Sequence, residues 1–312
     1  MLICLERAYL MQIGINNYAH QNMKGMKCMK ELIISIKPPD KILKGAGIPN
    51  TSFIPSYIYK LNIELINNSD QFKLCSFSST LGNGIRYLKN MEHEGPDNIL
   101  EKIKIVEPCE DIHNNNVIVF ANNINLSPHS INTITLDIGL CDRYTLNCSE
   151  NTGNKISHRE KIHYYGHLIC DNYVDSCSAS SLACDYELTV KCDDDKLKSG
   201  ESSKYYIHCR TGQYDVARSI YVRCILDSGL DFIGDSSNLQ PEKVYNFNGK
   251  TIIKWNVGSL QPSEIKRIGY MVTIKDDVEK GSMLKSKLNS NCVNNSTYTQ
   301  CPSSCEHFLT VE

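Results

Sequence analysis

The sequence has no long apolar run and no strong excess of charge, and its first 28 residues lead us to expect no signal peptide. No stretch approaches the roughly 18 consecutive apolar residues of a membrane-spanning helix, so we expect no membrane span. The formal net charge is −2 with both signs interspersed, which gives no electrostatic case for nucleic acid as a partner. Residues 1–28 lack an uninterrupted apolar core, because Glu6 and Arg7 interrupt it, and no small-residue cleavage site follows. We expect this segment to be a disordered arm or an incorrectly assigned start.

Local signatures of catalysis and cofactor binding are also missing. The chain has no G-x-S-x-G, no H-E-x-x-H, no phosphate-binding loop and no G-x-G-x-x-G. Nucleophilic catalysis needs a thiolate or hydroxyl beside a positioned base, and among 15 cysteines and 9 histidines such pairs arise by chance. We therefore expect a protein that is not an enzyme, with no catalytic residue and no cofactor. A spontaneous lysine–asparagine isopeptide bond stays open, because nothing in the sequence identifies its residues.

What the sequence does have in unusual quantity is cysteine, at 15 of 312 residues. The count is odd, so intramolecular pairing leaves at least one thiol for an intermolecular bond or as a free thiol. Each half of the chain is long enough to bury a core without disulfides, so the cysteines need another explanation. Our candidates for disulfides within or between chains are Cys141, Cys148, Cys170, Cys177, Cys184, Cys192, Cys292, Cys301 and Cys305.

Four sequence blocks occur twice in the same order, which indicates a tandem duplication. The first pair is ELIISIKPPDKILKG and ELTVKCDDDKLKSG, and the third pair shares the pattern Leu-x-Pro-x-x-Ile-x-x-Ile. The paired ranges are 31–45 with 187–200, 56–65 with 203–209, 126–138 with 260–272, and 184–190 with 305–311. We expect a longer first domain at 29–185, with insertions, and a second domain at 186–312.

Period-two alternation of β-branched and aromatic residues predicts many short strands. Examples are IYKLNIEL, NTITLDI, SIYVRCIL and TIIKWNV, and Gly, Pro and Asn turns separate them. Such a pattern favours an all-β protein made of two tandem immunoglobulin-like antiparallel β-sandwiches. The Cys–Trp–Cys core of antibody domains is absent, because Trp255 follows both Cys209 and Cys224. These two cysteines lie in apolar strands, and we expect them to be small buried residues.

The other cysteines concentrate near the end of each repeat. Cys170, Cys177 and Cys184 precede a Leu-Thr-Val strand, as do the three cysteines at 292, 301 and 305. We expect exposed loops at these positions, where a neighbouring domain or chain would lie. Zinc is the chemical alternative to cross-linking. Cys301 and Cys305 have the spacing of a ligand pair and His307 is close by, but no second tight pair completes a tetrahedral site.

A group of histidines at 158, 163 and 167 is a further metal candidate. The segment HYYGHLI contains Gly166 and alternates as a strand does, whereas ligation by histidines four apart requires a helix. We expect these histidines to be polar residues on a solvated strand face.

The second half of the chain resembles a known family. It contains Lys-x-Gly-Glu at 198–201, a Tyr-rich strand at 205–207, Gly-Leu-Asp-Phe-Ile at 229–233 and Trp-Asn-Val-Gly-Ser-Leu-x-Pro at 255–262. This order resembles the conserved-repeat domain of bacterial surface proteins known as domain of unknown function eleven. The resemblance covers about 125 residues and implies a tandem immunoglobulin-like sandwich with no catalytic residues. Members of the family usually have few cysteines, a signal peptide and a wall anchor. This chain departs from them in its cysteine content, and we expect it to depart from them also in having no signal peptide.

With its many cysteines the chain is similar to the cysteine-rich exosporium proteins of clostridial spores. This similarity implies synthesis in the mother-cell cytoplasm without a signal peptide, and assembly on the spore surface. We expect a structural protein whose partner is itself, in a homo-oligomeric ring or two-dimensional lattice locked by disulfides. Other spore-surface proteins are further possible partners. The alternative is an adhesin-like surface module that recognises a ligand through loops at the end of a sandwich.

Overall fold

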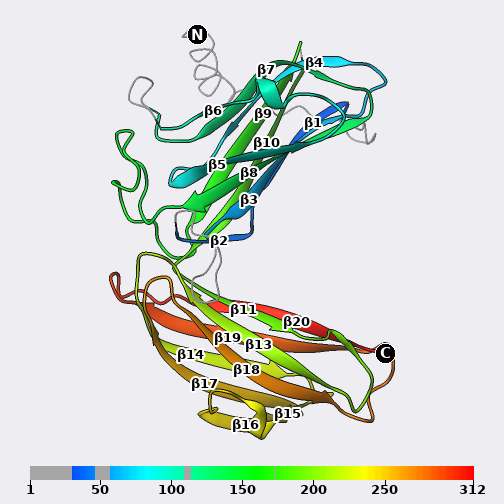
Figure 1. The fold of residues 1–312 in the computed structure, drawn as a ribbon, viewed down its shortest axis with the longest axis vertical. Coiled ribbons are helices and arrows are strands. Elements are labelled where there is room, and N and C mark those ends of the chain that lie inside the picture. The colour runs from blue at the N-terminus through cyan, green and yellow to red at the C-terminus, as the bar shows by residue number, and fades with distance from the viewer. Residues whose placement is uncertain (1–29, 46–56, 109–113, 172) are drawn as a thin grey trace, which may run out of the picture.

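The chain folds almost entirely into β-strands, which form two sandwiches (Figure 1). The computed structural model describes residues 30–45, 57–108, 114–171 and 173–312. In each domain a four-stranded sheet packs against a six-stranded sheet. The expected all-β fold of two tandem sandwiches is therefore confirmed. Residues 1–28, which we expected to form an arm, lie outside the described residues, as do Cys4, Cys28 and Cys109.

The described residues of domain one form ten strands and the short 3₁₀ helix η2 (Leu100–Lys102). Its strands are β1 (Leu32–Lys37), β2 (Lys41–Leu43), β3 (Tyr59–Asn67), β4 (Lys73–Thr80), β5 (Ile85–Glu94), β6 (Lys104–Val106), β7 (Ile118–Leu126), β8 (Ser130–Leu140), β9 (Lys161–Cys170) and β10 (Tyr173–Cys184). The strand order is β1-β3-β8-β5 in one sheet and β2-β10-β9-β4-β7-β6 in the other.

Domain two repeats this arrangement strand by strand. Its strands are β11 (Tyr186–Cys192), β12 (Lys196–Leu197), β13 (Ser202–Thr211), β14 (Ala217–Leu226), β15 (Leu230–Ile233), β16 (Lys243–Phe247), β17 (Lys250–Leu260), β18 (Ile265–Ile274), β19 (Met283–Asn294) and β20 (Ser303–Val311), with the 3₁₀ helix η4 (Gly234–Ser236) after β15. The sheets have the orders β11-β13-β18-β15 and β12-β20-β19-β14-β17-β16, so the two domains share one topology.

One of the four matched sequence blocks does not correspond to a matched structural element. Residues 184–190 end β10 and enter β11, the first strand of domain two, whereas 305–311 belong to β20, its last strand. The counterpart of β20 is β10, because both occupy the same place in their six-stranded sheets. Our pairing of these blocks was therefore wrong. A Leu-Thr-Val run fits the pleat of any half-buried strand and does not identify which strand it is.

Alternation of side chains builds the core of domain one. In β3 the inward residues Leu61, Ile63 and Leu65 are buried, and in register with Leu61 and Ile63 lie Leu136 and Ile134 of β8. Burial of each such side chain contributes about 1.5–3 kcal/mol. The polar residues between them face solvent, as the sequence pattern predicts.

Aromatic rings fill the core of domain two. The Trp255 ring packs on Tyr270 with centroids 5.3 Å apart, and Tyr270 packs on Tyr205 at 5.6 Å. The indole Nε1 of Trp255 donates to Ser237 Oγ at 3.2 Å, which satisfies its polar group. Cys209 and Cys224 are buried in the same core.

The two domains meet end to end (Figure 1). Asp185 is the single residue between β10 and β11. Short parallel pairs, β2 with β10 and β12 with β20, interrupt the otherwise antiparallel pairing. Among the described residues, no helix has the length and apolar character needed to cross a membrane.

Candidate functional site at the domain junction

A buried lysine lies at the centre of the junction between the domains. Lys44 follows β2 and only 1% of its side chain is exposed. Its Nζ lies 2.7 Å from Asp185 Oδ1 and 3.5 Å from Asp142 Oδ1, and it also donates to the carbonyl oxygen of Ile156. The backbone of Lys44 bonds to both domains, since its N–H donates to Cys184 and its carbonyl accepts from the N–H of Gln213. Lys44 therefore connects the domains through both its backbone and its charge.

A second lysine extends this ion-pair network. Lys155 Nζ, from domain one, lies 2.6 Å from Asp215 Oδ2 of domain two and 3.6 Å from Asp142 Oδ1. It also donates to Ser296 Oγ at 2.6 Å. Burial alone would raise the pKa of Asp215, but hydrogen bonds from Lys155, Ser296 and Asn294 outweigh it and hold that pKa below its ordinary value. The network contains three aspartates and two lysines, and so carries one negative charge in excess.

A tyrosine crosses from domain one into domain two. Tyr57 is fully buried, and its hydroxyl donates to the carbonyl of Thr211 at 3.0 Å and lies 3.1 Å from Ser263 Oγ. Burial raises the pKa of Tyr57 above its ordinary value. Its ring lies directly on Gly45, where any Cβ would clash with it. Glycine at position 45 is therefore required by this close approach.

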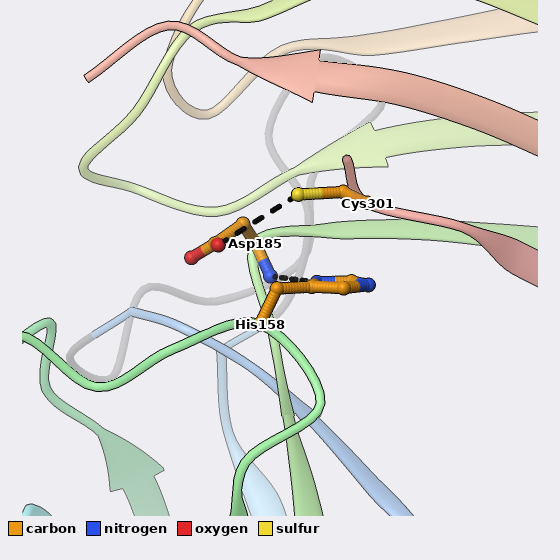
Figure 2. A group of neighbouring side chains, drawn as sticks. All are labelled: His158, Asp185 and Cys301. Atoms are coloured by element: carbon orange, nitrogen blue, oxygen red, sulfur yellow. Dashed lines mark hydrogen bonds between the residues drawn. The ribbon is translucent and has the colours of Figure 1, made fainter. Parts of the chain in front are cut away.

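Cys301, His158 and Asp185 gather at one side of the junction (Figure 2). Their potential ligand atoms all lie within 4.8 Å of one another. Cys301 Sγ lies 3.9 Å from Asp185 Oδ2, and His158 Nδ1 lies 3.1 Å from the backbone N of Asp185. The other ring nitrogen, His158 Nε2, lies 3.2 Å from the carbonyl oxygen of Pro302. Three segments from both domains thus bring a thiol, an imidazole and a carboxylate together.

In this group of three residues, neighbouring side chains shift the pKa values of the Cys301 thiol and of the His158 imidazole. The neighbouring Cys292 thiol lowers the pKa of the Cys301 thiol below its ordinary value; His158 adds to this effect, whereas burial opposes it. For His158, burial works toward a lower pKa, but Cys301 reverses this and raises it. A thiolate beside an imidazole is suited either to nucleophilic attack or to metal binding. Cys301 is 0% exposed, so a substrate has no direct access to this sulfur, and the arrangement favours an internal role.

The structure places most of the predicted cross-linking cysteines in strands, not in exposed loops. Cys170, Cys177, Cys184, Cys192, Cys292 and Cys305 all lie in strands β9, β10, β11, β19 and β20, while Cys141, Cys148 and Cys301 lie outside strands. All twelve cysteines in the described ranges have free thiols, and none of them is exposed. The expectation of exposed loops was therefore wrong. The alternation of the flanking residues carried the strand signal that we did not use.

The zinc ligands proposed from sequence do not come together. His307 Nε2 lies 2.9 Å from Cys192 Sγ, whereas Cys301 faces His158 and Asp185. Cys305 belongs to neither group of donors. His163 and His167 lie in β9, as the alternation predicts, but His158 precedes that strand and is part of the junction.

Sequence reasoning missed the charged residues of the junction altogether. Lys44 and Asp185 are 141 positions apart, and although both lie in repeat blocks, nothing in those blocks pairs them with each other. A Cys-Asp dipeptide occurs four times, at 141–142, 170–171, 184–185 and 192–193. Only Asp142 and Asp185 belong to the network, so the dipeptide alone does not identify it.

Comparison with known proteins identifies no family. No family model matches the chain, and no curated protein does so either. Among solved structures, the chain is similar to red sea bream transglutaminase at 11% identity and a TM-score of 0.37, over 91% of this chain and 31% of that one. It is also similar to the N-terminal domain of the Streptococcus gordonii adhesin Sgo0707 at 11% identity and a TM-score of 0.31, over 82% and 61% of the two chains. The chain thus spans about a third of the transglutaminase, and likenesses this distant carry no functional argument.

Proposed function

We propose that this chain is a non-enzymatic structural protein that associates with copies of itself through complementary charged surfaces of domain two. The observation that carries the proposal is the segregation of charge on that domain. The location that we propose for this assembly is the outer layer of a spore. This part of the proposal depends on the sequence resemblance alone.

A rigid two-domain unit is the first requirement of such a subunit. A linker of one residue leaves little freedom between the sandwiches, and the ion pairs of Lys44 and Lys155 fix the contact. The hydroxyl of Tyr57 adds a bond across the same junction. Such a unit loses little conformational entropy on assembly, because its domains are already held in place.

One sheet face of domain two is strongly basic. The outward positions of β14, β16, β17, β19 and β20 carry one acidic residue, Glu306, which pairs with Lys285 at 2.7 Å. Arg223 lies opposite Lys254, and Lys254 opposite Lys243, so three cations stand side by side in register. Like charges in such positions destabilise a sheet unless counter-charges are supplied. The cations of this basic face are Arg218, Arg223, Lys243, Lys254, Lys285 and Lys287.

The end of domain two that lies away from the junction is acidic. The segment before β13 and the loop between β18 and β19 meet there, since Gly200 N–H donates to Ile274 and Ser199 Oγ to the carbonyl of Val278. Lysines 196, 198, 275 and 280 offset only part of the negative charge. The exposed carboxylates of this acidic end are Asp193, Asp194, Asp195, Glu201, Asp276, Asp277 and Glu279.

Because the basic face and the acidic end are different surfaces, a contact between them is heterologous. Such contacts close into rings or continue as open assemblies, depending on the rotation between neighbours. The acidic end of one copy supplies the counter-charges that the basic face of the next one lacks. Charge complementarity of this kind also steers association and fixes its register.

The test is the oligomeric state, measured by sedimentation equilibrium at low salt and at about 1 M salt, where the Debye length falls to about 3 Å. We expect wild-type chains to associate at low salt and to dissociate at high salt. The double variant Arg223→Glu, Lys254→Glu should remain monomeric at low salt. Lys161→Glu, a charge reversal at an exposed position of β9 in domain one, is the matched control and should associate as wild type does.

Association that is indifferent to salt and to the basic-face variant would refute this proposal. The adhesin-like alternative predicts a monomer at every salt concentration that binds an immobilised ligand through its end loops. Electron microscopy of associated material would show whether rings or sheets form.

Disulfides between chains have a smaller part in this proposal than the cysteine count suggests. Most of the described cysteines are buried, so their sulfurs meet another chain only after local opening. Half-buried Cys148, in the loop between β8 and β9, is the candidate among them that needs least opening. Electrophoresis with and without reductant tests this part, and migration that reductant leaves unchanged would exclude covalent locking.

A further inference from the structure

We infer that the domain junction contains a zinc site formed by His158, Asp185, Cys292 and Cys301. Its ligands come from domain one, the linker and the β19–β20 hairpin of domain two, so a bound ion would tie the two sandwiches together. This ligand set differs from the one that spacing in the sequence suggested.

The distances between the donor atoms fit a small tetrahedral ion. Sulfur and nitrogen donors at zinc bond lengths of about 2.3 and 2.0 Å lie roughly 3.5 Å from each other. The donor atoms of His158, Asp185 and Cys301 already lie within 4.8 Å of one another, so closure around an ion needs movements of about 1 Å (Figure 2). Side-chain torsions suffice for a movement of this size.

Cys292 is the candidate for the fourth donor, and its Sγ lies outside the group of three donor atoms that are within 4.8 Å of one another. It lies beside Cys301 across the hairpin, where the N–H of Cys301 donates to the carbonyl of Cys292 at 2.8 Å. Its Sγ lies 3.7 Å from the carbonyl oxygen of Cys301, and both cysteines are buried. Two thiols, one imidazole and one carboxylate complete the four-ligand set of a structural zinc site.

Outer contacts orient two of these ligands. His158 Nε2 lies 3.2 Å from the carbonyl of Pro302, and as a donor there it leaves Nδ1 to face the ion. Nδ1 now accepts from the N–H of Asp185, and it gives up that bond when it binds the metal. Asp185 offers Oδ2 toward Cys301, while its Oδ1 stays on the ammonium of Lys44 at 2.7 Å. A carboxylate held in this way is a common neighbour of structural metal sites.

The charge of the junction is compatible with a divalent ion. Its three aspartates and two lysines leave one negative charge in excess when both thiols are protonated. Zinc binds thiolates, so each thiol that is still protonated releases its proton, which offsets part of the positive charge that the ion brings. The one negative charge in excess among the aspartates and lysines favours the remainder.

Cobalt(II) reports on such a site directly, because thiolate ligands produce charge-transfer absorption and tetrahedral geometry produces intense visible bands. We expect full-length reduced protein to bind one Co²⁺ per chain with both signatures, and Zn²⁺ to displace it. His158→Gln and Cys301→Ser should weaken binding by more than the roughly 10–100-fold that loss of an outer-shell partner costs. Cys292→Ser should lower the charge-transfer intensity by about half, because one of two thiolates is lost.

Cys192→Ser is the matched control, since it removes the thiol of the other cysteine–histidine pair and should leave the cobalt spectrum unchanged. Far-ultraviolet circular dichroism, which reports on both domains, verifies that each variant is folded, and His158→Gln changes a half-buried side chain conservatively. The inference is overturned if folded wild type shows no thiolate charge transfer, or if the spectrum survives His158→Gln but is lost in Cys192→Ser. Neither result bears on association through the basic face, which is measured separately.

Discussion

Replacement of Lys44 by methionine is the most direct test of the junction. Methionine retains much of the length of the side chain and removes only the ammonium group. The aspartates at 185 and 142 then lose a partner while they remain buried. The carbonyl of Ile156 also loses its donor. The perturbation therefore leaves uncompensated negative charge in the contact between the domains.

The expected cost follows from burial. Breaking a buried ion pair by removing one partner costs about 3–5 kcal/mol, because the remaining charge is left without compensation. Lys44 is 1% exposed and Asp185 is 7% exposed, so the full range applies. Lys60 provides a contrast, since it pairs with Asp137 at 2.7 Å but is 50% exposed. A surface pair of this kind contributes about 0–1 kcal/mol.

Denaturant unfolding followed with two probes measures the effect. The fluorescence of Trp255 reports on domain two, and far-ultraviolet circular dichroism reports on both domains. In wild type we expect the transitions to coincide, because the junction couples the domains. In Lys44→Met they should separate and the free energy of unfolding should fall by about 3–5 kcal/mol. Lys60→Met should lose less than about 1 kcal/mol with coincident transitions. Equal, small losses for both variants would refute the argument that the junction is held by buried charge.

Three further predictions concern single residues. Gly45→Ala should destabilise domain one by about 1–3 kcal/mol in thermal unfolding, because the added Cβ would clash with the buried ring of Tyr57. Gly234→Ala is the control, since the space around Gly234 is open, and it should change stability by less than about 0.5 kcal/mol. The pKa of Asp215 is lowered in the folded protein, so this carboxylate stabilises the fold above pH 3.8, its ordinary pKa, and the stabilisation is lost as the pH falls through the folded pKa. Asp215→Asn should therefore make the free energy of unfolding fall less steeply at acid pH. An unchanged dependence on pH would contradict this. Brief alkylation of the native protein, followed by peptide mapping, should label half-buried Cys148 before the buried Cys209, Cys224 and Cys292. Early labelling of these three buried cysteines would show that the cores open readily.

The sequence determines the strands through a local property, which is why the fold could be predicted. In β3 and β8 the alternation of apolar and polar residues is set by the pleat, and it can be read without knowing the partner strand. The duplication was visible for the same reason, except where Leu-Thr-Val led to the wrong pairing of 184–190 with 305–311. Three residues with β-propensity occur in many strands, and topology alone separated β11 from β20.

The junction could not be predicted, because its residues are neighbours only after both sandwiches have folded. Lys44 and Asp185 have no spacing in common, and His158 meets Cys301 across 143 positions of the chain. The cysteines misled us for a related reason. The clustering of three cysteines near the end of each repeat led us to expect exposed loops, yet the segment SCSAS around Cys177 alternates in burial within β10. The alternation was the physically relevant signal.

The single-residue connection at Asp185 also has a mechanical consequence. Strand β10 ends at Cys184 and β11 begins at Tyr186, so tension along the chain passes from one sheet into the next without a slack segment. β10 pairs with β9 over ten positions and β11 pairs with β13 over seven. Because inter-strand hydrogen bonds run perpendicular to the strands, a pull along β10 and β11 shears many of them at once. A layer built from such units would transmit stretching forces through its backbones, and an atomic force microscope would record two high-force unfolding events per chain.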